Sequence, residues 1–215
     1  MEGIEGRVPF IRVHSEEDLQ DGVRRAAEVL HSGGLVAYPT ESFYGLAVNP
    51  FDEDALRRLF AIKKRQEDNP ILLLLPSTHF LPRYASEISE MAWELIRRFW
   101  PGGLTLVFKA SSRISPLLTG HTGKIGLRLS GHFPATALAR AFDAPITGTS
   151  ANISGQPACV SAEEVFHALG EGVDLILDGG RTKGPPGSTL LDVTASPPRL
   201  IREGIIAYDQ LKDFL

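Results

Sequence analysis

The sequence has one cysteine, Cys159, in 215 residues. A single cysteine forms no internal disulfide and cannot build a cysteine-based zinc site. The lack of disulfides is typical of proteins from a reducing compartment. Cys159 has no catalytic partner near it in the sequence, so we interpret it as a structural residue rather than a nucleophile.

Long apolar runs are absent as well. No segment reaches the roughly 20 apolar residues of a transmembrane helix, and the start, MEGIEGRVPF, lacks the apolar core of a signal peptide. We therefore expect a cytoplasmic protein that does not enter a membrane. The net charge of −4 argues against broad non-specific binding of nucleic acid, although it is compatible with a local basic cleft.

Several motifs of common enzyme classes are also missing. The chain has no G-x-x-x-x-G-K-[ST] phosphate loop, no G-x-G-x-x-G dinucleotide turn and no G-x-S-x-G nucleophile elbow. Its six histidines show no metal-ligand spacing. The sequence therefore gives no support to a P-loop enzyme, a Rossmann dehydrogenase, an α/β-hydrolase or a zinc enzyme.

What is present is the pattern of a globular α/β protein. Hydrophobic residues make up 43% and charged residues 22%, and the length suits one domain, residues 1–215. We expect helices near residues 15–30, 52–62, 86–99, 133–142, 161–169 and 210–214. We expect extended segments or strands near residues 8–13, 35–38, 71–75, 104–109, 125–129, 145–147, 173–177, 188–193 and 200–201. Because residues 104–129 resemble a hairpin, a twisted mixed sheet flanked by helices is favoured over a purely parallel one.

Two polar loops follow predicted strands. The first comes after Pro39 and carries two hydroxyls, a carboxylate and a phenol within five residues: Thr40, Glu41, Ser42 and Tyr44. The second, residues 148–155, is rich in Gly, Ser and Asn, which hold phosphate oxygens in some proteins but also form ordinary turns.

The candidate site residues stand at the ends or edges of predicted elements. They comprise four hydroxyls (Thr40, Thr105, Ser150, Ser188), four cations (Lys63, Arg65, Arg128, Arg202) and one amide (Asn152). This set suits an anionic ligand, such as a nucleotide with a second carboxylate substrate, better than it suits covalent catalysis. Arg128 alternates with apolar neighbours, so it either faces outward or clamps an anion, and its pattern alone does not decide between the two.

Several of these residues belong to motifs that occur in a fixed order. The motifs are Pro39-Thr40-Glu41-x-x-Tyr44-Gly45-Leu46, Lys63-x-Arg65, Asp68-Asn69-Pro70, Trp100-Pro101-Gly102-x-Leu104-Thr105, Arg128, Ser150-x-Asn152-x-Ser154-Gly155, Ser188-Thr189, Asp192 and Arg202-x-Gly204. Together they resemble the YrdC-like family of threonylcarbamoyl-AMP synthases, from about Val23 to Gly204, in its short, single-domain form.

The resemblance implies a YrdC-like fold with a concave basic cleft and an enzyme of the nucleotidyltransferase type. The implied reaction converts L-threonine, bicarbonate and ATP, with Mg²⁺, into threonylcarbamoyl-AMP and pyrophosphate, for N6-threonylcarbamoyl modification of tRNA adenosine 37. It further implies a weak contact with tRNA and downstream threonylcarbamoyl-transfer proteins as partners.

The resemblance also assigns roles to residues. It implies ATP contacts for Lys63, Arg65, Asn69, Thr105, Ser150, Asn152 and Arg202, with Lys63 and Arg65 catalytic. It implies threonine contacts for Thr40, Arg128 and Ser188, with Arg128 as the partner of the carboxylate. No acidic metal cage is expected.

The chain departs from the family pattern at two positions. Gln66 replaces a frequent proline, and Leu74 replaces a histidine that contacts threonine in many members. Two alternatives therefore stay open: a paralogue that uses another carbamoyl substrate, and a non-catalytic RNA-binding module that uses the same cleft.

Overall fold

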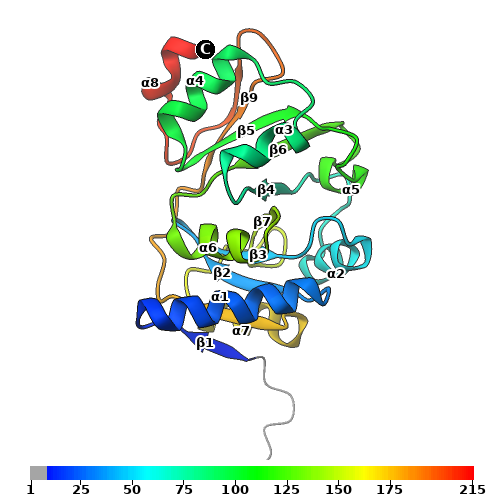
Figure 1. Cartoon of the computed structure of the whole chain (residues 1–215), viewed down its shortest axis with the longest axis vertical. Helices are drawn as coiled ribbons and strands as arrows, with labels where there is room; N and C mark the ends of the chain where they lie inside the picture. The colour runs from blue at the N-terminus through cyan, green and yellow to red at the C-terminus, as the bar shows by residue number, and fades with distance from the viewer. Residues whose placement is uncertain (1–8) are drawn as a thin grey trace, which may run out of the picture.

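Ten strands form one sheet within residues 9–215, the part of the chain that this computed structural model describes. Their order across the sheet is β1-β8-β2-β3-β7-β4-β6-β5-β9-β10. The strands are β1 (Phe10–Arg12), β2 (Val36–Pro39), β3 (Tyr44–Ala47), β4 (Leu72–Leu74), β5 (Leu104–Lys109), β6 (Lys124–Arg128), β7 (Ile146–Ser150), β8 (Leu175–Asp178), β9 (Thr189–Asp192) and β10 (Arg199–Arg202). In Figure 1 they lie one above another along the long axis, from β1 at the bottom to β5 and β9 near the top.

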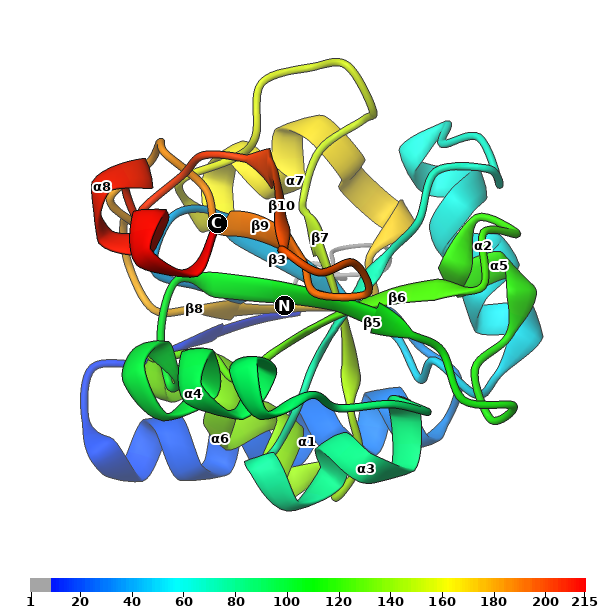
Figure 2. The ribbon, with the colours of Figure 1, turned by 90° about the horizontal axis from the view of Figure 1, so that it is seen from above.

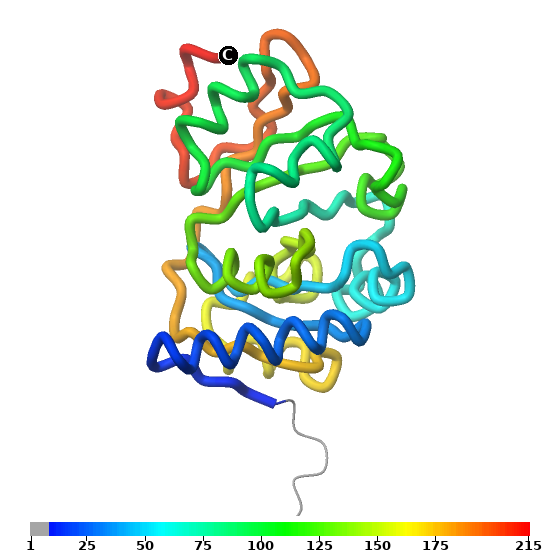
Figure 3. Tube along the Cα trace, viewed as in Figure 1, coloured from blue at the N-terminus to red at the C-terminus, as the bar shows by residue number. Residues whose placement is uncertain are grey.

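The sheet is mixed, as predicted. β4 pairs in parallel with β6 and β5 in parallel with β9, whereas β5 and β6 form the expected antiparallel pair. β1 pairs in parallel with β8, and Figure 3 shows this blue N-terminal strand beside a segment from late in the chain. Val8, where the extended start was expected to begin, lies outside the described residues.

The α-helices are α1 (Glu16–His31), α2 (Glu53–Lys63), α3 (Leu81–Tyr84), α4 (Glu90–Phe99), α5 (Pro116–Thr119), α6 (Phe133–Ala141), α7 (Ala162–Leu169) and α8 (Tyr208–Leu211). Three short 3₁₀ helices occur among the described residues: η1 (Thr78–Phe80), η2 (Gly170–Gly172) and η3 (Lys212–Phe214). None of the helices in this described part has the length and apolar character to cross a membrane.

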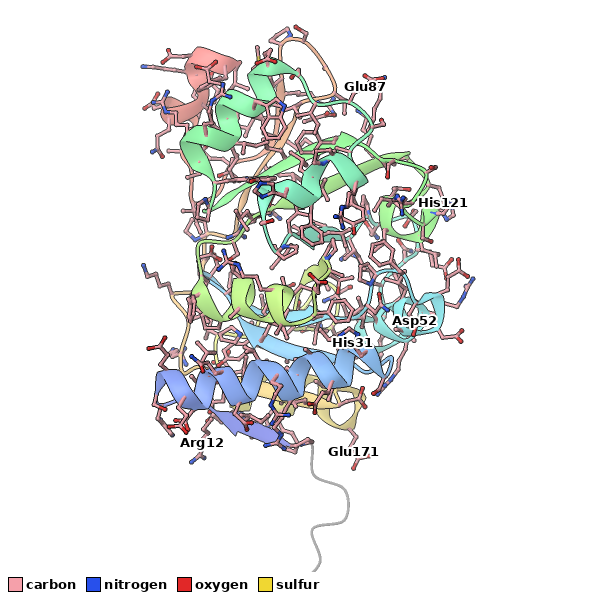
Figure 4. The ribbon with its side chains drawn as sticks, viewed as in Figure 1. Arg12, His31, Asp52, Glu87, His121 and Glu171 are labelled. Atoms are coloured by element: carbon pink, nitrogen blue, oxygen red, sulfur yellow. The ribbon has the colours of Figure 1, made fainter. Side chains whose placement is uncertain are left out.

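Side-chain caps fix the starts of the main helices. Ser15 accepts a hydrogen bond from the Asp18 amide and Ser161 accepts one from the Glu164 amide, at the residues where these two helices were expected to begin. Asp52, labelled in Figure 4, caps α2 in the same way. The helix expected from residue 86 starts instead at Glu90, because Ser89 rather than Ser86 provides the cap.

One strand was not predicted. The loop after Pro39 is shorter than expected, because Tyr44–Ala47 forms β3 and pairs antiparallel with β2. Four residues that include a glycine give too weak a strand signal on their own. The polar residues Thr40, Glu41 and Ser42 therefore lie in the turn at the ends of β2 and β3.

The helices are distributed unequally over the two faces of the twisted sheet. Figure 2, which looks along the long axis, shows α1, α3, α4 and α6 on one side and α7 on the other. Along β6 the side chains alternate: Ile125 and Leu127 are buried in the larger apolar core with residues of α4, whereas Lys124, Gly126 and Arg128 line a cavity. The face of β6 that turns away from that core is therefore the floor of the candidate site.

Candidate functional site

A cavity of about 770 Å³ lies on this face of the sheet. This volume is within the range of ordinary small-molecule sites. Six of the predicted site residues line it: Thr40, Arg65, Arg128, Ser150, Ser188 and Arg202. The other four, Lys63, Asn69, Thr105 and Asn152, do not line it, although each of them hydrogen-bonds directly to a residue that does.

Two glycines on the floor of the cavity leave space for a ligand. Gly126 on β6 and Gly148 on β7 both line it, and Leu72 of β4 lies between them. A β-carbon on Gly126 would come within 3.1 Å of the Leu72 β-carbon, and one on Gly148 would clash with the end of the same leucine. Larger residues at these positions would fill the space a ligand needs.

Arg128 points into the cavity, so the outward-facing alternative for this residue is wrong. Its side chain is 8% exposed and pairs with Glu41, with Nη2 lying 2.7 Å from Oε2. Its Nε donates to the carbonyl of Gly102 at 2.7 Å. Nη1 has no hydrogen-bond partner among residues 9–215, which leaves this nitrogen for a ligand.

Glu41 fixes this arginine to the turn that follows β6. Its Oε1 accepts hydrogen bonds from the Ser130 hydroxyl at 2.9 Å and the Gly131 amide at 2.7 Å. Burial by itself would raise the pKa of Glu41, but the neighbouring Arg128 guanidinium and these hydrogen bonds bring it below its ordinary value. The carboxylate is therefore ionised at neutral pH.

We expect Glu41→Gln to lower the free energy of unfolding by about 3 kcal/mol at pH 7, because it leaves Arg128 buried without its counter-charge. Since folding lowers the pKa of Glu41, the stabilisation is complete above the ordinary glutamate pKa of about 4.3 and is lost as the pH falls through the lower folded value. Urea denaturation at pH 7, 5, 4 and 3 checks this, with the exposed Glu94→Gln as control. A difference between wild type and Glu41→Gln that stays constant down to pH 3 would refute this account of the pair.

Lys63 and Asn152 lie behind the wall of the cavity. Lys63 is 1% exposed, and its Nζ donates to the backbone carbonyls of Ser150 and Asn152, the latter at 2.8 Å. The Asn152 amide group donates to the carbonyls of Ile153 at 3.0 Å and Gln156 at 2.6 Å. Both side chains thus hold the loop that presents Ser150, and a direct contact with phosphate stays a prediction for each.

Burial and the nearby Arg65 lower the pKa of Lys63 to about 7. Arg65 itself lines the cavity, and its guanidinium donates to the carbonyls of Asn69 at 3.3 Å and Pro70 at 2.8 Å. These bonds tie the arginine to the segment that leads into β4. Asn69 therefore contacts the site through its backbone in this structure.

Thr105, Ser188 and Arg202 form a second connected group. The Thr105 hydroxyl is buried and donates to the Ser188 hydroxyl at 3.0 Å, and Arg202 donates to the Ser188 carbonyl at 2.9 Å. Ser188 and Arg202 line the cavity, whereas Thr105 does not line it and holds the Ser188 hydroxyl through its hydrogen bond. A threonine contact for Ser188 stays a prediction, as do nucleotide contacts for Arg202 and Thr105.

Sequence reasoning gave no role to an ion pair in the cavity wall. Lys124 of β6 lies 2.8 Å from the nearly buried carboxylate of Asp192 on β9, and both residues line the cavity. Lys124 is four residues before Arg128, so strand alternation would have placed both on one face. The pairing with Asp192 joins residues that are distant in the sequence, and no local signal reports it.

Most of the charged residues that line the cavity are cationic. Among the described lining residues, five carry positive charge (Arg65, Lys124, Arg128, Arg199, Arg202) and one, Asp192, carries negative charge. Such an arrangement attracts anions even in a protein of negative net charge.

Metal ligation by protein groups alone finds no support in the described part of the chain. Residues 9–215 contain no group of three or more His, Cys, Asp or Glu that could hold a metal ion. The labelled His31 and His121 in Figure 4 lie at separate places on the molecule. Asp192 already binds Lys124 and the Thr194 hydroxyl, so it offers a cation little free capacity.

Comparison with known proteins gives the family. Residues 28–204 match the family of Sua5, YciO and YrdC proteins, whose description reads "Telomere recombination". The threonylcarbamoyl-AMP synthase of Pyrococcus abyssi is 39% identical over 190 residues, which are 88% of this chain and 56% of that protein. The threonylcarbamoyl-AMP synthase of Bacillus subtilis is 35% identical over 205 residues, which are 94% of this chain and 59% of that protein. The chain thus spans between half and two thirds of the length of these two relatives.

A solved structure shares the fold. This chain superposes on the crystal structure of Pyrococcus abyssi Sua5 complexed with L-threonine with a TM-score of 0.90 at 37% sequence identity. The superposition covers 96% of this chain and 60% of the Pyrococcus abyssi chain. The agreement extends over nearly all of the described elements.

Proposed function

This chain belongs to the Sua5, YciO and YrdC family, and we propose that it is an L-threonylcarbamoyladenylate synthase. The proposed reaction converts L-threonine, bicarbonate and ATP into threonylcarbamoyl-AMP and pyrophosphate, and its product serves the N6-threonylcarbamoyl modification of tRNA adenosine 37. The observation that carries the proposal is the single cationic cavity in which six predicted substrate residues meet.

The amino-acid end of the site is assigned to Arg128, Thr40 and Ser188. The free Nη1 of the Arg128 guanidinium suits the carboxylate of threonine, because a charge-assisted hydrogen bond to a carboxylate is stronger than one between neutral groups. Glu41 and the Gly102 carbonyl hold the guanidinium in place, so little side-chain entropy is lost when threonine binds.

The nucleotide end is assigned to Arg65, Ser150 and Arg202. The threonine amine first combines with bicarbonate to give N-carboxy-threonine and water. A carbamate oxygen of N-carboxy-threonine then attacks the α-phosphorus, the bond from that phosphorus to the bridging oxygen breaks, and pyrophosphate leaves. Charge grows on the pyrophosphate oxygens, and the fixed cations of the wall stabilise it. The nucleophile is already an anion, so placement matters more than a general base.

Mg²⁺ is proposed to enter with ATP. Asp192, the one carboxylate among the described lining residues, is engaged by Lys124, so the cation would be held by phosphate oxygens and water more than by this chain. When bound, Mg²⁺ neutralises charge on the departing phosphates. The protein residues then need only to orient the two substrates.

Leu74 favours a second candidate, a paralogue that acts on another amino acid. This residue lines the cavity, is 3% exposed and lies beside Arg128 in the parallel β4–β6 pair. An apolar neighbour gives the hydroxyl of threonine no hydrogen bond. A screen of the twenty amino acids as carboxylate substrates separates the two candidates: threonine should give the fastest turnover in the synthase, and an apolar amino acid in the paralogue.

The proposed partners follow from the product. An acyl adenylate is labile, so we expect downstream threonylcarbamoyl-transfer proteins to receive it. We also expect a weak tRNA contact through cationic residues of the cavity lining. A cytoplasmic location fits this proposal, because a chain with a single thiol is typical of a reducing compartment.

The test measures pyrophosphate release with ATP, L-threonine, bicarbonate and Mg²⁺, leaving out one component at a time. We expect release only when all are present. Release of pyrophosphate that does not depend on threonine, while ATP still binds, would overturn the synthase assignment.

A further inference from the structure

We propose that Lys63 acts on a bound triphosphate from behind the cavity wall, as the positioning residue of the Ser150–Ser154 segment, and does not touch the phosphates itself. The inference rests on the proposed function, because it assumes that a nucleotide triphosphate occupies the cavity. It departs from the direct phosphate contact that the motif suggests.

The hydrogen bonds of Lys63 account for all its donors. An ammonium group has three N–H bonds. The Nζ of Lys63 has three acceptors: the Ser150 carbonyl, the Asn152 carbonyl at 2.8 Å and the Asn152 side-chain oxygen at 3.4 Å. No donor is left for a phosphate unless these bonds break.

The backbone of Lys63 holds the same segment from a second point. Its carbonyl accepts a hydrogen bond from the Ser154 amide at 2.8 Å. The end of α2 is thus joined to both ends of the Ser150–Ser154 segment, and the Ser150 side chain is the part of it that lines the cavity. Loss of the lysine would free a loop that the site needs in one position.

The charge of Lys63 also reaches the cavity. The group is almost fully buried, so water screens its field little. The ionisable groups that influence it are Arg65, from the segment after α2, and the thiol of Cys159; no carboxylate is among them. The cation therefore has no carboxylate counter-ion among residues 9–215, and an anion beside Ser150 would supply one.

This arrangement couples nucleotide binding to protonation. With its pKa lowered to about 7, Lys63 is largely neutral at pH 8 in the free protein. A triphosphate beside the loop favours the ammonium form, so ATP binding at pH 8 should take up a proton. At pH 6 the lysine is already charged, and the uptake should disappear.

The first experiment is calorimetric titration with Mg-ATP at pH 8 and pH 6, in buffers of different ionisation enthalpy. It compares wild type, Lys63→Met and the adjacent exposed lysine variant, Lys64→Met. We expect an uptake of roughly half a proton or more at pH 8 for wild type and Lys64→Met, as the linkage of a shifted pKa requires. For Lys63→Met we expect no proton uptake at pH 8 and an affinity for Mg-ATP about 10-fold lower than that of wild type.

The second experiment separates positioning from contact without any ligand. Hydrogen exchange of the Ser154 amide should be at least about 10-fold faster in Lys63→Met than in wild type, and unchanged in Lys64→Met. Equal exchange in all three proteins would overturn the positioning role. If Lys63→Met does not fold, hydrogen exchange of the wild-type Ser154 amide decides: exchange at least as slow with Mg-ATP as without it supports the positioning role, and faster exchange with Mg-ATP overturns it.

Failure of this inference differs from failure of the proposed function. Wild type that binds Mg-ATP with no proton uptake at pH 8, or Lys63→Met that keeps both uptake and affinity, overturns the inference alone. Wild type that binds no ATP at either pH overturns the proposed function, and the inference with it.

Discussion

Arg128→Ala should raise KM for threonine about 100-fold while it changes KM for ATP by less than about threefold. The guanidinium is the cationic group we assign to the threonine carboxylate, and a charge-assisted hydrogen bond is lost with it. Initial rates of pyrophosphate release, with each substrate varied in turn, provide the measurement. Equal losses for both substrates would remove Arg128 from the amino-acid end of the cavity.

A control is needed because Arg128 also balances Glu41. Removing the arginine leaves that carboxylate nearly buried and unpaired, which costs stability. The double variant Arg128→Ala/Glu41→Gln removes both charges, so it should recover stability but not the affinity for threonine. Recovery of both properties would show that the loss came from misfolding rather than from a missing contact.

Gly204→Ala should lower the free energy of unfolding by about 3 kcal/mol, because the segment after β10 lies directly over the start of β9. A β-carbon at Gly204 would lie 2.6 Å from the Ser188 carbonyl carbon and 2.7 Å from the Thr189 nitrogen. These are backbone atoms, and they cannot rotate away as a side chain does. Thermal and urea denaturation report the effect on stability.

The same change should weaken ATP binding, because the backbone shift displaces Ser188 together with Arg202. Gly187→Ala is the matched control for stability, since a β-carbon there meets only ordinary contacts, the nearest at 3.8 Å from Phe43. We expect the free energy of unfolding of Gly187→Ala to lie within about 1 kcal/mol of the wild-type value. If Gly187→Ala lost as much stability as Gly204→Ala, the backbone clash would not explain the need for glycine in the Arg202-x-Gly204 motif.

The sequence predicted the features that depend on local patterns. The alternation of apolar residues in β6 located that strand, and the hairpin of β5 and β6 indicated the mixed sheet. Capping side chains located α1 and α7 within a residue or two. These signals are local because hydrogen bonds and periodic burial act between near neighbours.

Features that depend on distant contacts were not predictable in this way. Lys63 and Arg65 stand two residues apart and look equivalent, yet one is buried against the Ser150–Ser154 segment and the other lines the cavity. Residues two apart at a helix end point in different directions, and full burial of a lysine is rare. The pair of Lys124 with Asp192, and that of Arg128 with Glu41, join separate strands and loops that only the folded sheet brings together.

We propose that one cavity joins threonine, bicarbonate and ATP. Mass spectrometry of the nucleotide product formed from ¹³C-bicarbonate is the decisive measurement. We expect an adenylate that carries threonine and one labelled carbon, and that disappears when threonine is omitted. An unlabelled threonyl adenylate, or AMP alone with threonine present, would contradict this proposal.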